Sequence, residues 1–210
     1  MRLAHTSDLS FLRTPTEADP WRVLVSGCIA GLPCGVDGTD YGMAAHAPAL
    51  LGLPTVRRVP FCPESHGLGV PRTMPDLHGG DGFAALDGRA RVYDEHGADL
   101  TESMIEGARA MVEVASAERV DFAVLTDMSA ACGTQVISDG CRFDTPRRYQ
   151  GGVGVAAAML IRAGVPVVSQ RDHRTLARLR AVAEPGWSPP AGLRDHHESD
   201  WYVGAFGAGS

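Results

Sequence analysis

Lysine is missing from this chain of 210 residues, because all 19 residues counted as lysine or arginine are arginines. A compositional bias of the genome is the simplest explanation. The absence nevertheless excludes three kinds of chemistry that need a lysine amine. These are Schiff-base catalysis, attachment of pyridoxal phosphate and the Walker A phosphate loop.

An excess of positive charge is also lacking, and the formal net charge is −6. Proteins that bind DNA or RNA usually carry a basic stripe or patch, so we expect no nucleic-acid partner. No apolar run approaches the roughly 18 residues that a membrane-spanning helix needs. The segment from Met1 to Pro20 has no apolar stretch of signal-peptide length and includes Asp8, Glu17 and Asp19. We therefore predict a cytoplasmic protein without a membrane partner.

Cysteine is scarce and odd in number, with five residues in the chain. A disulfide framework needs pairs of cysteines and an oxidising compartment, so it is unexpected in a cytoplasmic protein. The remaining roles are metal ligands, ligands of an iron–sulfur cluster or reactive thiols. The five are Cys28, Cys34, Cys62, Cys132 and Cys141.

Apolar runs that alternate with amphipathic stretches predict an α/β fold. We expect a single domain with a mostly parallel central sheet and helices on both faces, in a Rossmann-like layering. A loose N-terminal arm would span residues 1–20, the domain 21–184, and a tail 185–210. The predicted strands are 23–26, 57–62, 122–125 and 165–168. The predicted helices are 43–52, 101–117, 151–163 and 173–183. Residues 63–90 are expected to form a long loop.

Three of the cysteines follow predicted strands. Cys28, Cys62 and Cys132 each lie at or just after the carboxyl end of a strand. Ligands of open α/β sheets bind beyond the carboxyl ends of the strands, so these cysteines could converge on one crevice. Nothing in their spacing is a local metal-binding motif.

Short motifs surround the same three cysteines. They read Ser26-Gly27-Cys28-Ile29-Ala30-Gly31, Phe61-Cys62-Pro63-Glu64 and Ser129-Ala130-Ala131-Cys132-Gly133. In this order and at these intervals they resemble the 2-thiouracil desulfurase (TudS-like) family. The later stretches Ser138-Asp139-Gly140 and Gly152-Val153-Gly154-Val155-Ala156 match it as well, and the resemblance covers about residues 22–170.

The resemblance implies a [4Fe–4S] cluster held by Cys28, Cys62 and Cys132, with the fourth iron open. Such an iron is thiophilic and Lewis acidic, so it can bind and polarise a C=S sulfur. The implied reaction is the non-redox desulfuration of a thiolated small molecule, a pyrimidine such as 2-thiouracil. Cys34 is then a spare thiol near the site and Cys141 a structural residue. The oligomeric state stays open.

Activation of water requires a general acid/base. Glu64 is the first candidate, because it lies two residues from a ligand cysteine, but it could instead cap a helix or pair with Arg72. Ser129 could orient the substrate or relay a proton. Asp37 could do either, although Asp37-Gly38 is also a turn signature.

Some positions depart from the family pattern. Gly35-Val36 stands where the family has Arg-Tyr, Thr126 where a lysine is common, and Ser129-Ala130-Ala131 where it has Ser-Pro-Ser. Two other functions therefore stay open. One is a protein that holds a cluster or sulfide without catalysis, and the other is a zinc or thiol enzyme that uses Cys132 or Cys34.

Overall fold

The computed structural model describes residues 1–6 and 8–207, and its centre is a parallel sheet. The strands β1 (Trp21–Ser26), β2 (Val56–Phe61), β5 (Phe122–Leu125) and β8 (Val167–Ser169) are arranged in the order β2-β1-β5-β8, and every pair is parallel. This confirms the predicted α/β class with a central parallel sheet. None of the helices in the described ranges is long and apolar enough to cross a membrane.

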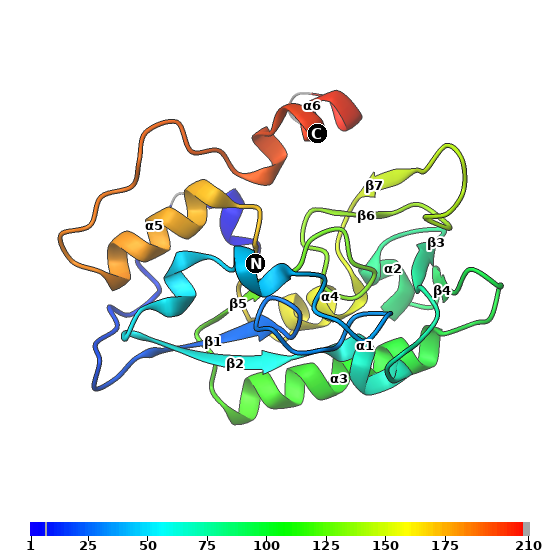
Figure 1. Cartoon of the computed structure of the whole chain (residues 1–210), viewed down its shortest axis with the longest axis horizontal. Coiled ribbons are helices and arrows are strands. Elements are labelled where there is room, and N and C mark those ends of the chain that lie inside the picture. Colours follow the sequence, from blue (N-terminus) through cyan, green and yellow to red (C-terminus); the bar gives the residue numbers. More distant parts are fainter. Residues whose placement is uncertain (7, 208–210) are drawn as a thin grey trace.

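Both faces of the sheet are buried, as expected for parallel strands covered by helices. In β1, Val23 and Val25 belong to one core and Leu24 to the other. The core of Leu24 includes the helices α3 (Thr101–Ala117) and α4 (Val155–Arg162); the core of Val23 includes α5 (His173–Ala183) and the 3-10 helix η3 (Ala49–Gly52). Figure 1 shows α3 below the sheet and α5 above it.

Small elements gather beyond the carboxyl ends of the strands, at the right of Figure 1. One antiparallel pair joins β3 (Asp76–His78) to β4 (Arg91–Tyr93), and another joins β6 (Val136–Ser138) to β7 (Tyr149–Gly151). The prediction of one long loop over 63–90 is wrong. This stretch forms α1 (Pro63–Leu68), β3 and α2 (Gly82–Leu86), elements too short to show a clear hydrophobic period.

The predicted helix over 43–52 is also absent as one element. The chain forms two 3-10 helices there, η2 (Met43–His46) and η3, separated at Ala47 and Pro48. Proline has no backbone N–H and disfavours the α conformation in the residue before it, so a continuous α-helix cannot pass this point.

The N-terminal segment packs against the edge of the central sheet, and the expected tail contains two helical elements. The 3-10 helix η1 (Leu3–His5) buries Leu3 completely, and Arg2 bridges to Val167 of the edge strand β8. The expected tail contains the 3-10 helix η4 (His196–Glu198) and α6 (Asp200–Phe206). Ser7 in the expected arm, and residues 208–210 at the end of the expected tail, lie outside the described residues.

The helix α1 lies against α3 at a very close contact between two glycines and opposing backbone. A Cβ atom on Gly67 would stand 2.0 Å from the carbonyl oxygen of Ser103, and one on Gly107 would stand 2.0 Å from that of Pro63. Real side chains do not approach so closely, so only glycine fits at both positions. This contact fixes the position of α1, which carries Glu64 directly after Cys62.

We expect Gly107→Ala to lower the free energy of unfolding by about 1–3 kcal/mol, because the added methyl group forces α1 away from α3. The matched control is Gly204→Ala in α6, since nothing lies within 4 Å of a Cβ at that helical position. The control should leave stability equal or raise it by about 0.5–1 kcal/mol. Urea denaturation measures both. Equal stabilities for the two variants would contradict the close contact.

Candidate active site

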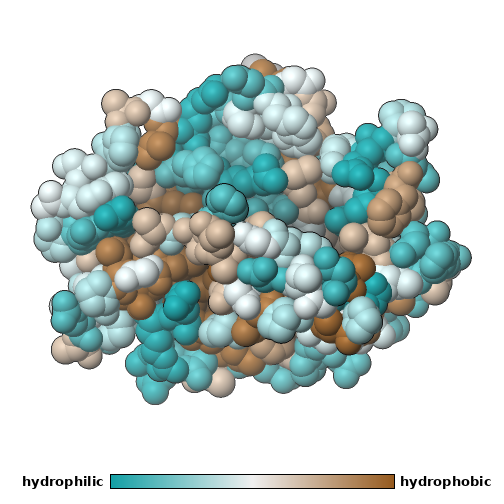
Figure 2. Space-filling model, viewed as in Figure 1, coloured by the Kyte–Doolittle hydropathy of each residue, from teal (hydrophilic) through white to brown (hydrophobic). Residues whose placement is uncertain are grey.

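A cavity of about 300 Å³ opens at the carboxyl edge of the sheet. Residues that follow β1, β2 and β5 line it, as expected for an open α/β sheet. On the molecular face in Figure 2, hydrophobic and hydrophilic residues are interspersed. Its lining combines four thiols, a few polar groups and apolar side chains, among them Cys28, Cys34, Cys62, Cys132, Glu64, Arg72, Thr126, Ser129, Val36, Tyr41, Met43, Met74, Pro75 and Met128.

The thiols come from separate segments of the chain. Cys28 lies in the turn after β1, Cys62 directly follows β2 and precedes α1, and Cys132 lies in the loop after β5. Cys62 accepts a hydrogen bond from the backbone N–H of Ser65 at 3.3 Å and so caps α1. Cys28 Sγ lies 3.0 Å from Thr126 Oγ1. The structure therefore brings together the three cysteines that the motifs single out.

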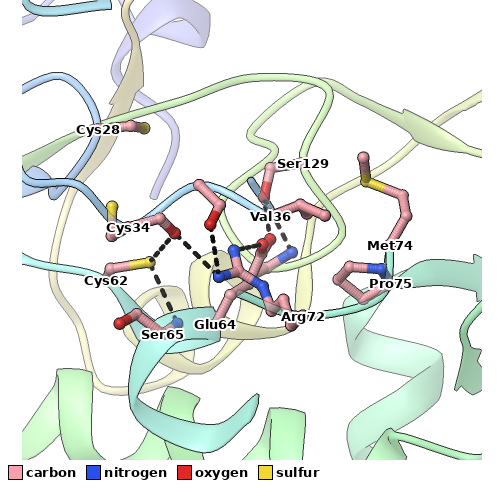
Figure 3. A network of polar contacts seen from close by, with 12 residues as sticks. Cys28, Cys34, Val36, Cys62, Glu64, Ser65, Arg72, Met74, Pro75 and Ser129 are labelled. Carbon is pink, nitrogen blue, oxygen red and sulfur yellow. Dashed lines mark hydrogen bonds and ion pairs between the residues drawn. The ribbon is translucent and has the colours of Figure 1, made fainter. Parts of the chain in front are cut away.

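The fourth thiol, Cys34, lies between two of the others, and Figure 3 shows it beside Cys62. The Cys34 thiol has one proton, which it can donate to the sulfur of Cys28 or of Cys62, and these two interactions raise its own pKa far above the usual range. The same interactions are the largest cause that lowers the pKa of Cys28, to about 7, and that lowers the pKa of Cys62. Burial, in contrast, raises the pKa of Cys132 well above its usual value. Metal binding at Cys132 must therefore release a proton.

A polar network stands beside the thiols. Glu64 Oε2 forms an ion pair with Arg72 Nη2 at 2.6 Å, and Glu64 Oε1 accepts a hydrogen bond from Ser129 Oγ at 2.8 Å. Burial alone would lower the pKa of Arg72, but the carboxylate of Glu64 raises it. The ion pair is well shielded, since the side chains of Arg72 and Glu64 are only 5 % and 15 % exposed. A charged carboxylate is thus held at the cavity wall (Figure 3).

Ser129 links this network to Cys132. Its Oγ accepts hydrogen bonds from the backbone N–H groups of Ala131 at 3.2 Å and Cys132 at 3.0 Å. Because its own proton points to Glu64, the Ser129 hydroxyl orients the carboxylate and the cysteine loop at the same time. Arg72 closes the other side, where its Nη1 donates to the carbonyl oxygens of Cys34 and Gly69 at 2.9 and 3.2 Å.

Three cysteine thiols from separate segments are available as ligands in this cavity. Within residues 1–6 and 8–207, no three His, Cys, Asp or Glu side chains lie close enough to hold one metal ion. In an iron–sulfur cluster each cysteine thiolate binds a different iron, so the sulfurs have to stand apart around a common space. Cys28, Cys62 and Cys132 surround one cavity in this way.

Comparison with known proteins agrees with the resemblance that the motifs indicate. A model of the family described as 2-thiouracil desulfurase matches residues 23–172. The chain belongs to the 2-thiouracil desulfurase family. A family relative from Bacillus subtilis (strain 168), the uncharacterized protein YbbK, is 31 % identical over 151 residues, which are 71 % of this chain and 96 % of YbbK. A solved [4Fe–4S]-dependent thiouracil desulfidase, TudS, superposes with a TM-score of 0.62 and 29 % identity, over 78 % of this chain and 99 % of that one.

Glu64 and Ser129, two of the predicted acid/base candidates, line the cavity of this family member, whereas Asp37 does not. Asp37 is exposed, and its Oδ1 accepts hydrogen bonds from Thr39 N at 2.9 Å and Thr39 Oγ1 at 2.8 Å. The geometry therefore supports a role for Asp37 in stabilising a local turn rather than in acid/base chemistry. Glu64 can both pair with Arg72 and serve as the acid/base, because its carboxylate forms the ion pair and still lines the cavity.

Sequence reasoning missed Asp127, a buried carboxylate in the cavity wall. It lies two residues after the carboxyl end of β5, so the rule that selected the cysteines after strands could have found it. Met43 and Met74 were also missed, and no local pattern distinguishes them from core methionines.

The hydrogen bonds to Cys28 predict unusual reactivity in the cluster-free protein. Alkylation of Cys28 by iodoacetamide should rise with a midpoint near pH 7, because Cys34 and then Thr126 stabilise its thiolate. An ordinary cysteine titrates near pH ~8.5. Peptide-resolved mass spectrometry measures the alkylation of each cysteine, and Cys34→Ala should move the Cys28 midpoint upward. A midpoint that stays the same in this variant would contradict the hydrogen-bond assignment.

Proposed function

We propose that this protein is a desulfidase that removes sulfur from a thiolated pyrimidine such as 2-thiouracil, using a [4Fe–4S] cluster held by Cys28, Cys62 and Cys132. The observation that carries the proposal is the meeting of these three thiols with the Glu64–Ser129 pair around one cavity. Family membership supports the reaction, and the [4Fe–4S] dependence of the similar TudS structure supports the cofactor.

When bound, the cluster supplies an open, thiophilic and Lewis acidic iron for the C=S sulfur. The overall reaction is C=S plus H₂O giving C=O plus H₂S, so no electron donor or acceptor is required. The protein has to bind the heterocycle, direct one water molecule to the thiocarbonyl carbon and move two protons.

Glu64 provides the base for this reaction. Its Oε2 is paired with Arg72, and its Oε1 accepts a hydrogen bond from the hydroxyl of Ser129. A water molecule that approaches the thiocarbonyl carbon donates its proton to this carboxylate, directly or through the Ser129 hydroxyl. The protonated Glu64 then returns this proton to the sulfur. As the C–S bond breaks, the Glu64 carboxylate takes the second proton from the new hydroxyl group on the same carbon and passes it to the departing sulfur, which is ordinary general acid/base catalysis.

The remaining wall of the cavity suits a flat heterocycle. Val36, Met74, Pro75 and Met128 present apolar surface, and Figure 3 shows Met74 and Pro75 on the side opposite the cysteines. Methionine sulfur packs favourably against aromatic rings. The thiocarbonyl group can thus point toward the cysteines while the ring lies against this apolar wall.

The proposal is tested with anaerobically reconstituted protein and 2-thiouracil. Chromatography of the pyrimidine and a colorimetric assay of sulfide should give uracil and sulfide in equal amounts, and the cluster-free protein should give neither. A cluster-loaded protein that binds 2-thiouracil without converting it would instead support the role of a carrier. A colourless, zinc-loaded protein that consumes 2-thiouracil would support the zinc or thiol enzyme.

A further inference from the structure

The segment 193–207 makes an unusual contact with the wall of the cavity. It follows α5 and lies after residue 172, where the match to the family model ends. The contact involves His196, which is 4 % exposed, and Asp127, which is 4 % exposed. His196 Nδ1 lies 2.8 Å from Asp127 Oδ2.

Asp127 holds the loop that carries Ser129 and Cys132. Its Oδ1 accepts hydrogen bonds from the backbone N–H groups of Thr134 at 2.9 Å, Gln135 at 3.1 Å and Val136 at 3.2 Å. One carboxylate oxygen thereby ties both ends of the loop 127–136 together. The cavity-lining side chains of the loop depend on this closure for their position.

The other carboxylate oxygen of Asp127 depends on His196. Burial alone would raise the pKa of Asp127, but the hydrogen bond and charge of His196, with the backbone N–H groups, lower it below the usual value. A buried carboxylate that loses a partner is strongly disfavoured. Removal of His196 would therefore draw Asp127 toward water and away from the loop.

His196 is itself firmly held. Its backbone N–H donates to Asp172 Oδ1 at 3.1 Å, and its ring stacks on Trp201 with a centroid distance of 5.6 Å. The preceding residue, Asp195, is 1 % exposed and accepts hydrogen bonds from Thr175 N and Thr175 Oγ1, both at 2.8 Å. The segment is thus anchored on the first turn of α5, and Asp172 Oδ1 joins it to the loop a second time because it also accepts a hydrogen bond from Gln135 Nε2.

We infer that His196 is a positioning residue for the active site, and that the segment 193–207 acts through Asp127 to hold the loop of Ser129 and Cys132 in its working conformation. The contacts of Asp127 and His196 are sufficient to infer that the segment holds the loop. The further expectation that this helps the protein to retain a cluster rests on the proposed function.

Two variants of His196 separate the hydrogen bond from the ring. His196→Phe keeps an aromatic ring against Trp201 but removes the donor to Asp127. His196→Asn places an amide N–H near the position of Nδ1 and restores the donor. His197→Asn is the control, since the neighbouring ring stacks on His5 rather than contacting Asp127.

Hydrogen exchange of the cluster-free protein is the direct readout. In His196→Phe, the amides of Thr134, Gln135 and Val136 should exchange about 10- to 100-fold faster, while amides of α3 keep their protection. His196→Asn should restore most of the protection, and His197→Asn should leave it unchanged. Unchanged loop exchange in His196→Phe would overturn the inference.

If His196→Phe fails to fold, Trp201→Ala carries the test, because Trp201 is 43 % exposed and its loss leaves the core intact. It should accelerate exchange of the same three amides by a smaller factor, and unchanged exchange there would overturn the inference too. After reconstitution, His196→Phe should also lose iron to a chelator faster than His196→Asn. If the loop exchange changes while the protein never binds iron, the proposed function fails and the positioning role stands.

Discussion

Alanine at Cys28, Cys62 or Cys132 should reduce the iron content of the reconstituted protein from about four atoms per chain to background, because each thiolate binds a different iron. Each replacement leaves one iron of the cluster without its cysteine ligand. Iron and acid-labile sulfide analysis after anaerobic reconstitution measures the loss. The visible absorbance of the cluster should disappear in the same three variants.

The two remaining cysteines are the controls for this prediction. Cys141→Ala should bind iron like the parent protein, since Cys141 does not line the cavity. Cys34→Ser should also retain the cluster, because Cys34 is not one of the three proposed ligands and a serine hydroxyl can still donate its one hydrogen bond to a neighbouring sulfur. Loss of iron from Cys34→Ser but not from Cys132→Ala would refute the assignment of the ligands.

Glu64→Gln should lower the turnover of 2-thiouracil by about 10²- to 10⁴-fold while the iron content stays unchanged. Glutamine has nearly the shape of glutamate and can still bind Arg72 and Ser129, but it cannot accept a proton from water. The loss should therefore fall on kcat rather than on cluster loading. Single-turnover assays at equal iron content measure it.

Asp37→Asn provides the comparison for Glu64, since Asp37 is exposed and its carboxylate forms a local turn. This variant should retain activity within about 2-fold, as surface substitutions away from a site usually do. If Asp37→Asn were inactive and Glu64→Gln active, the acid/base assignment would have to be exchanged between the two residues.

The architecture could be predicted where its signals were local. Short apolar runs such as 122–125 mark buried strands, and their alternation with helices such as 101–117 predicts a parallel sheet. The position of a cysteine after each of three strands then predicts one shared edge. The structure shows this arrangement, with Cys28, Cys62 and Cys132 around one cavity.

Other features depend on contacts between distant segments and leave no local pattern. The helix α1 spans only Pro63–Leu68, and it is held by Gly67 and Gly107, which are far apart in the sequence. The pairing of Asp127 with His196 joins residues 69 positions apart. Neither contact could be expected from periodicity, because the partners are far apart in the sequence and meet only in the folded chain.

Mössbauer spectroscopy of the ⁵⁷Fe-reconstituted protein, with and without 2-thiouracil, tests the central claim most directly. Three thiolate-bound irons and one open iron predict a [4Fe–4S] spectrum in which about one quarter of the iron changes its parameters when 2-thiouracil is added. A protein that binds no cluster, or a cluster whose four irons all stay unchanged with 2-thiouracil, would contradict the account.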